Sequence, residues 1–146
     1  MKAADLDAVL AQGAVLYARL RTVTSPEPHF CIVMNASPAS DECIVLTVVS
    51  SKTDTTIRRV AALGQPPETL VRITPKDYPP LKVDSVVNCN DPKRDTLFSL
   101  RAEAAAGGVK ICPPMPPEIV ARLVAGMRAS ALVRDSYKAL LGASQP

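Results

Sequence analysis

The chain has 146 residues, enough for one domain with a core of its own. Its 47% apolar and 21% charged residues are typical of a globular protein and exclude a disordered chain. The net charge of +3 permits an anionic partner without demanding one. No apolar run approaches the roughly 20 residues of a membrane helix, and the first residues lack the apolar core of a secretory signal. We therefore expect a cytoplasmic protein.

The N-terminal part of the chain predicts a helix, a strand and a loop. Apolar residues recur at helical spacing over residues 3–12, and Gly13 follows as a helix stop. Residues 14–23 have the pattern of a strand. The two prolines within residues 24–28 predict a loop, because proline cannot join the interior of a ladder.

Two short apolar runs rich in Val and Ile come next, at residues 30–34 and 43–49. The polar, proline-containing residues 35–42 separate them. This pattern predicts two adjacent antiparallel strands of a compact β core.

Further short strands are expected through the middle of the chain. Residues 57–63 predict a strand that ends at Gly-Gln-Pro-Pro, and residues 69–74 alternate apolar and polar side chains as a half-buried strand does. Residues 83–89 predict the next strand. Residues 97–100 and 109–112 predict a final hairpin around an Ala-Gly-Gly bend.

A proline cluster at residues 113–117 introduces a C-terminal helical part, with Glu118 in the first helical turn. Its apolar stripe predicts core packing or a dimer contact; the stripe comprises Ile119, Val120, Leu123, Val124, Met127, Leu132, Val133, Leu140 and Leu141. We predict one domain over 1–146, with a helix at 3–12, a β-barrel core at 14–112 and helices at 117–142. The fold class is mainly β, a small barrel of five to seven short antiparallel strands with terminal helices.

The four cysteines, Cys31, Cys43, Cys89 and Cys112, lack the paired short spacing of a zinc site, and one histidine adds little. They are expected to be free thiols that act as small buried hydrophobes. Aromatic residues are scarce at 3%, which argues against the base-stacking surface that single-strand binders use.

Residues 84–97 carry the strongest functional signal. A short apolar strand begins with a serine and runs into two amides, an Asp-Pro turn and two cations. Polar side chains held at a strand end beside positive charge suit a phosphate-bearing polymer.

Three motifs in order resemble the MazF/PemK toxin superfamily (Kid/CcdB-like), over about residues 13–125. They are an apolar strand introduced by a basic residue, a second strand that ends in a hydroxyl pair, and a later Ser-Val-Val-x-Cys-x-x-Pro-Lys segment. The resemblance implies an SH3-like barrel, a homodimer, and cleavage of single-stranded RNA without metal or cofactor. It also implies a small acidic antitoxin as partner, and no membrane. CcdB-like relatives instead bind DNA gyrase.

The family's hydroxyl pair falls on Ser50 and Ser51, and its basic strand-opening residue, commonly arginine followed by proline, falls on His29. The family's arginine and acidic positions around the cysteine fall on Asn88 and Asn90. An asparagine amide cannot exchange protons at useful pH, so a strict copy of the family's acid–base pair is absent at these positions.

RNA cleavage without metal needs a base for the 2′-hydroxyl, an acid for the leaving oxygen, and donors for the charged phosphorane. His29 is the only histidine and titrates near neutrality when unperturbed. The predicted catalytic residues are His29 and Ser51. The predicted RNA-binding residues are Ser50, Lys52, Asn88, Asn90, Lys93 and Arg94.

Each of these assignments has a structural alternative. A strand-end histidine can titrate without consequence, and serines after a strand commonly start a turn by bonding local backbone. Arg58 and Arg59 are as consistent with a solvated rim as with backbone contacts. The competing functions are a non-catalytic module that binds a protein or nucleic acid through the same groove, and a small phage or host-defence regulator.

Overall fold

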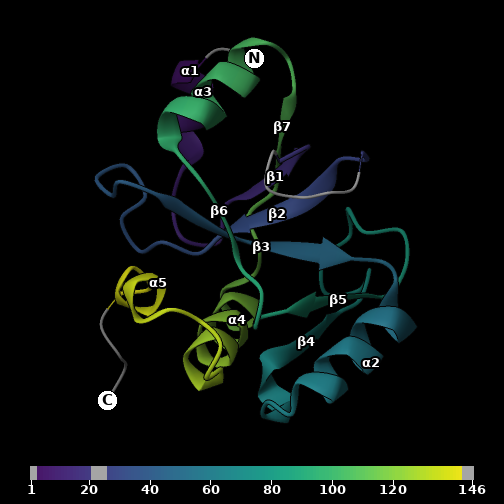
Figure 1. The fold of residues 1–146 in the computed structure, drawn as a ribbon. Helices are drawn as coiled ribbons and strands as arrows, with labels where there is room; N and C mark the ends of the chain where they lie inside the picture. The colour runs from purple at the N-terminus through teal and green to yellow at the C-terminus, as the bar shows by residue number, and fades with distance from the viewer. Residues whose placement is uncertain (1–2, 21–25, 143–146) are drawn as a thin grey trace.

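The computed structural model describes residues 3–20 and 26–142 (Figure 1). Over these residues the fold is mainly β, with seven strands and five α-helices. The strands are β1 Val15–Ala18, β2 His29–Val33, β3 Ile44–Ser50, β4 Leu70–Ile73, β5 Ser85–Asn88, β6 Lys93–Asp95 and β7 Val109–Cys112. The helices are α1 Ala3–Val9, α2 Thr53–Leu63, α3 Leu97–Ala105, α4 Pro117–Ala129 and α5 Asp135–Ala139, with a short 3-10 helix η1 at Pro67–Thr69.

The strands form one antiparallel sheet in the order β4-β5-β3-β2-β1-β7, and β6 pairs with β3 beside this path. The predicted antiparallel neighbours at residues 30–34 and 43–49 are confirmed as β2 and β3. Within the described residues, no ladder joins β7 to β4, so the sheet is not closed into a barrel. The hydrogen bonding of these residues therefore does not form the closed β-barrel that was expected over 14–112.

Strand β3 has partners along both edges. One edge pairs with β2, and the other pairs first with β6 and then with β5. On β3 only Thr47 and Val48 separate the Leu46↔Lys93 and Val49↔Val87 pairs, whereas residues 88–92 separate them on the partner. The extra residues bulge out of the ladder. The amide-rich part of residues 84–97 is this bulge.

Two hydrophobic clusters lie on opposite faces of the sheet. Helices α1 and α3 lie on one side of the sheet and α4 on the other (Figure 1). One cluster packs β residues such as Ile32 and Val45 against α4, and the other packs Cys31 and Leu46 against α1 and α3. Because both faces of β2 and β3 are covered, their sequences are nearly continuous apolar runs rather than alternating ones. The apolar stripe of the C-terminal part is confirmed as core packing, since Ile119, Leu123 and Met127 are buried in the first cluster, as are Val133 and Leu141.

Two predicted β segments are wrong. Residues 57–63 belong to helix α2, which buries Thr56 and Val60 and ends at Gly64 in the left-handed conformation. Residues 97–100 open helix α3, because the Thr96 hydroxyl caps it by accepting a hydrogen bond from the Ser99 amide at 3.0 Å. The predicted hairpin is thus absent, and β7 pairs with β1 instead. Helices are therefore not confined to the two ends of the chain.

The N-terminal expectations are met in part. Helix α1 ends at Val9, three residues short of the predicted end, and Gly13 adopts a φ of +91° in the turn that follows. Its amide donates to the Val33 carbonyl at 2.8 Å, which fixes the entry into β1. Residues 21–23 of the predicted strand 14–23 lie outside the described residues. No helix in the described ranges is long and apolar enough to span a bilayer.

Gly126 provides a test of how α4 packs. A Cβ atom there would lie 2.7 Å from the Glu68 carbonyl oxygen and 2.8 Å from the Cys89 Sγ. We expect Gly126→Ala to destabilise the fold by about 1–3 kcal/mol through overpacking, although alanine is intrinsically the better helix former. Thermal and urea unfolding measure this. In the exposed control Ala125→Gly, the cost is about 1 kcal/mol from helix propensity alone. A Gly126→Ala protein as stable as the parent contradicts the packing.

Candidate functional site

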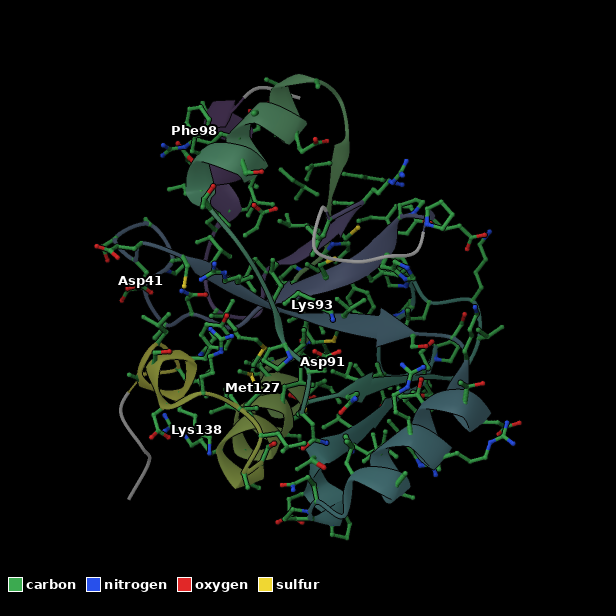
Figure 2. All side chains as sticks on the ribbon, in the orientation of Figure 1. Asp41, Asp91, Lys93, Phe98, Met127 and Lys138 are labelled. Atoms are coloured by element: carbon green, nitrogen blue, oxygen red, sulfur yellow. The ribbon has the colours of Figure 1, made fainter. Side chains whose placement is uncertain are left out.

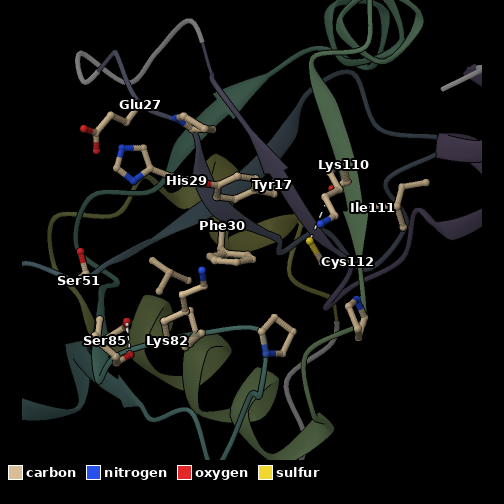
Figure 3. A pocket seen from close by; sticks show the side chains of 16 residues that line it. Tyr17, Glu27, His29, Phe30, Ser51, Lys82, Ser85, Lys110, Ile111 and Cys112 are labelled. Atoms are coloured by element: carbon tan, nitrogen blue, oxygen red, sulfur yellow. Dashed lines mark hydrogen bonds between the residues drawn. The ribbon is translucent and has the colours of Figure 1, made fainter.

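A groove of about 680 Å³ opens where β1, β2 and β7 face the segment that leads into β5 (Figure 3). It occupies the open side of the sheet, where β7 has no further strand partner in the described part of the chain. Its size is that of a site for one small-molecule ligand. The lining residues are Tyr17, Glu27, Pro28, His29, Phe30, Val49, Ser51, Pro80, Leu81, Lys82, Val83, Ser85, Lys110, Ile111, Cys112 and Pro113.

The floor of the groove is aromatic. The rings of Tyr17 and Phe30 lie 4.7 Å apart between centroids at an angle of 44°, and Phe30 meets Tyr78 edge-on at 6.2 Å. The Tyr78 hydroxyl donates to the Pro113 carbonyl at 2.6 Å and ties the segment before β5 to the end of β7. Although aromatic residues are scarce in the sequence, Tyr17 and Phe30 both line this groove, and Tyr78 packs against Phe30.

Positive charge and hydroxyl groups surround the aromatic floor. Lys82 and Lys110 are exposed and reach the groove from opposite walls, with Lys82 extending beside Phe30 (Figure 3). Ser51 and Ser85 add hydroxyls, and that of Ser85 donates to the Val83 carbonyl at 3.0 Å. This combination of a ring face, ammonium groups and hydroxyls can bind an anionic ligand that carries a flat ring.

His29 opens strand β2 directly after the proline-containing loop, as the sequence predicts. Its ring is half-buried in the groove wall, and its Nε2 atom is buried without a hydrogen-bond partner in the described part of the chain. An unpaired buried nitrogen costs on the order of 1–3 kcal/mol, and such groups in a folded protein call for an explanation such as a catalytic role. Glu27 lines the same groove two residues earlier.

The predicted catalytic residues His29 and Ser51 both line the groove. Because β2 and β3 are antiparallel, the start of β2 and the end of β3 lie at the same end of the sheet. Ser50 has a structural role instead. Its Oγ accepts from the Lys52 amide at 3.1 Å and from the Thr56 hydroxyl at 3.3 Å, so it starts the turn into α2. The Lys52 side chain is exposed and is not part of the groove lining.

The other predicted RNA-binding residues lie apart from the groove, at the far end of β5 and on β6. The Asn88 Oδ1 accepts from both the backbone and the side-chain nitrogen of Asn90 at 3.0 Å, so the two amides do come together. Asn90 is buried, and its own Oδ1 has no partner within the described residues. Lys93 pairs with Asp91 at 2.9 Å (Figure 2), and Arg94 is exposed on β6 opposite Val45.

Several groove residues were not predicted from the sequence. The pairing of β1 with β7 brings Tyr17 opposite Lys110, and Lys82 reaches the same groove from the loop before β5. Glu27 carried a weak signal, because it stands beside the histidine in the same loop.

The cysteines are free, as predicted, and only Cys112 lines the groove. Burial raises the pKa of the Cys31 and Cys89 thiols to about 12 and also raises the pKa of Cys112. A thiol with a raised pKa is a poor nucleophile near neutral pH. Across the described ranges, no three His, Cys, Asp or Glu side chains gather as metal ligands would.

No protein-family profile matches the chain, and a search of curated proteins also finds no match.

The raised thiol pKa values predict slow alkylation of the native protein. At neutral pH a rise from 9 to about 12 lowers the thiolate fraction of Cys31 and Cys89 about a thousandfold. We expect iodoacetamide to modify these thiols only after unfolding in urea, and to modify Cys112 faster as the pH rises above 9. Peptide mass spectrometry locates the label. Rapid labelling of Cys31 or Cys89 in the native state at pH 7 contradicts the burial.

Proposed function

We propose that the groove binds single-stranded RNA and that the protein is a metal-independent endoribonuclease of the MazF/PemK type. The observation that carries the proposal is the meeting of His29 and Ser51 with Lys82 and Lys110 around an aromatic floor. These residues come from separate strands and loops, and together they provide a proton-transfer group, phosphate contacts and a ring face.

Single-stranded RNA suits this groove for a physical reason. Bases in a duplex are stacked on one another, whereas those of a single strand can be splayed onto an aromatic side chain. Phe30 offers such a ring, supported from behind by Tyr17 and Tyr78. Lys82 and Lys110 line the groove and are exposed to solvent. In this proposal, they bind the phosphates on either side of that base.

Cleavage requires two proton transfers around the scissile phosphate. In the proposed reaction, Glu27 takes the proton of the 2′-hydroxyl, whose oxygen attacks phosphorus. His29 in its protonated form gives its proton to the leaving 5′-oxygen, and a 2′,3′-cyclic phosphate remains. Lys82 and the Ser51 hydroxyl stabilise the charged phosphorane.

The proposal also includes a homodimer and neutralisation by a small acidic antitoxin. The exposed lysines of the groove support the second point, because an acidic segment would compete with RNA for them.

A non-catalytic binding module is the second candidate, and one observation favours it. Asn88 and Asn90 stand where the family carries its acid–base pair, and they bond each other away from the groove. Such a module would bind RNA or a protein through the same lysines and aromatic floor without forming product.

The cleavage assay separates these two functions. Purified protein incubated with end-labelled single-stranded RNA in EDTA is expected to give fragments that end in a cyclic phosphate. His29→Ala and His29→Asn should both lower the rate at least about a hundredfold, because general acid–base catalysis contributes that much. Ser51→Ala should also lower the rate, because its hydroxyl stabilises the phosphorane in the proposed reaction. Ser40→Ala is its matched control, since Ser40 is exposed and outside the groove lining. Intact RNA with the parent protein removes the catalytic part of the proposal.

Binding is tested separately by fluorescence anisotropy on RNA with 2′-O-methyl groups, which cannot be cleaved by 2′-hydroxyl attack. Phe30→Leu keeps an apolar side chain but removes the ring, so we expect about a tenfold loss of affinity or more. Lys82→Ala should weaken binding and reduce the salt dependence of the affinity. The exposed Lys76 lies outside the groove, and Lys76→Ala is the charge-matched control. Equal affinities for all these variants contradict RNA binding in the groove.

A further inference from the structure

Helix α2 begins where the groove ends. Ser51 lines the groove, Lys52 follows, and α2 starts at Thr53. The helix carries Arg58 and Arg59 on its exposed surface. Its 11 residues extend about 16 Å from the groove end of the sheet, at 1.5 Å per residue.

Arg72 of β4 lies on the same face of the sheet as α2. Val86 of β5 is the register partner of both Arg72 and Ser50, so these side chains point to one face. The Ser50 hydroxyl is bonded to Thr56 of α2, which shows that this face is the one that α2 covers. Arg72 is exposed there.

In the part of the chain that the structure describes, carboxylates do not neutralise the arginines of this surface. Arg58 bonds the backbone carbonyl of Asp54 at 3.4 Å rather than its carboxylate. Among the described residues, no carboxylate lies within ion-pair distance of Arg58, Arg59 or Arg72. Arg101 and Lys93, by contrast, pair with Asp7 and Asp91.

The groove is too small for a long strand. A volume of about 680 Å³ accommodates about one or two nucleotides. A longer RNA must leave the groove, and on the Ser51 side the chain that it meets is Lys52 and then α2. Unpaired cations beside that exit would release counterions from each phosphate that they contact.

We propose that the basic face of α2, formed by Lys52, Arg58, Arg59 and Arg72, is a second RNA contact that follows the phosphate chain out of the groove. This contact is independent of base sequence, because arginine and lysine bind phosphates there and no base edge is read. It makes the protein prefer single strands longer than the groove holds. The inference rests on the proposed RNA binding by the groove.

The test compares 2′-O-methyl RNAs of about four and about twelve nucleotides, lengths that bracket the usual range of single-strand sites. The parent protein should bind the longer strand at least about tenfold more tightly. The double variant Arg58→Ala/Arg59→Ala should lose this advantage while its affinity for the short strand stays the same. On the longer strand, the slope of log affinity against log salt concentration should become shallower by about 1.4. Two phosphate contacts are lost, and each contributes about 0.7 to that slope.

The control is Arg122→Ala/Arg134→Ala, which removes the same charge from exposed positions of the C-terminal helical part. If this control weakens long RNA as much as the α2 variant does, the effect is one of net charge and the inference is wrong. Equal affinity of the parent for both lengths also overturns it and leaves groove binding intact. If the short strand binds nowhere, the proposed function itself fails.

Discussion

The hydrogen bonding of β3 along both of its edges is the constraint on which the rest of the structure depends. Strand β3 has partner strands on both edges and apolar clusters on both faces, so it lies at the centre of the sheet. The position of β3 fixes the start of β2 and the start of β5 at one end of the sheet. His29, Ser51 and Ser85 thereby meet at the groove, although they belong to three different elements. The floor needs one more connection, the hydrogen bond from Tyr78 to Pro113, which joins the two walls across the open side of the sheet.

The sequence predicted the strands that form this centre but not the helices around them. Strands β2 and β3 are uninterrupted runs of β-branched and other apolar residues, and burial on both faces of a sheet produces that pattern. Residues 57–63 were predicted as a strand because Ile57 and Val60 favour strands, although these residues form part of α2. The informative signals lay at the ends of that segment, in Thr53-Asp54 at its start and Gly64 at its stop. For residues 97–112 the decisive signal was the capping side chain of Thr96, and β7 then found its partner in β1, far away in sequence. Local patterns do not encode such distant pairing.

The candidate site shows the same division. His29 and Ser51 were predictable because each closes or opens a recognisable strand. Lys82 and Lys110 were not, because Lys82 belongs to a loop and Lys110 to a strand whose partner was predicted wrongly, and only the tertiary fold places them on opposite walls. The low aromatic content argued against a base-stacking surface, and that prediction missed the aromatic groove for a related reason. A low count says how many rings exist, whereas binding depends on whether they gather, and Tyr17, Phe30 and Tyr78 lie in one cluster.

The separation of the amide pair from the groove changes what the family resemblance implies. Asn88 and Asn90 belong to the bulge between β5 and β6, and their mutual hydrogen bonds shape that bulge. Cys89 between them packs against α4 at Gly126, so this segment anchors the helix to the sheet. The polar amides of residues 84–97 thus shape the bulge, and the apolar Cys89 packs against α4, so both kinds of residue have a structural role. The proposed chemistry therefore lies at the opposite end of β5, where His29 lines a groove that also holds a carboxylate and two ammonium groups. The mechanism proposed for this end uses Glu27 as proton acceptor and His29 as proton donor, because both side chains line the groove.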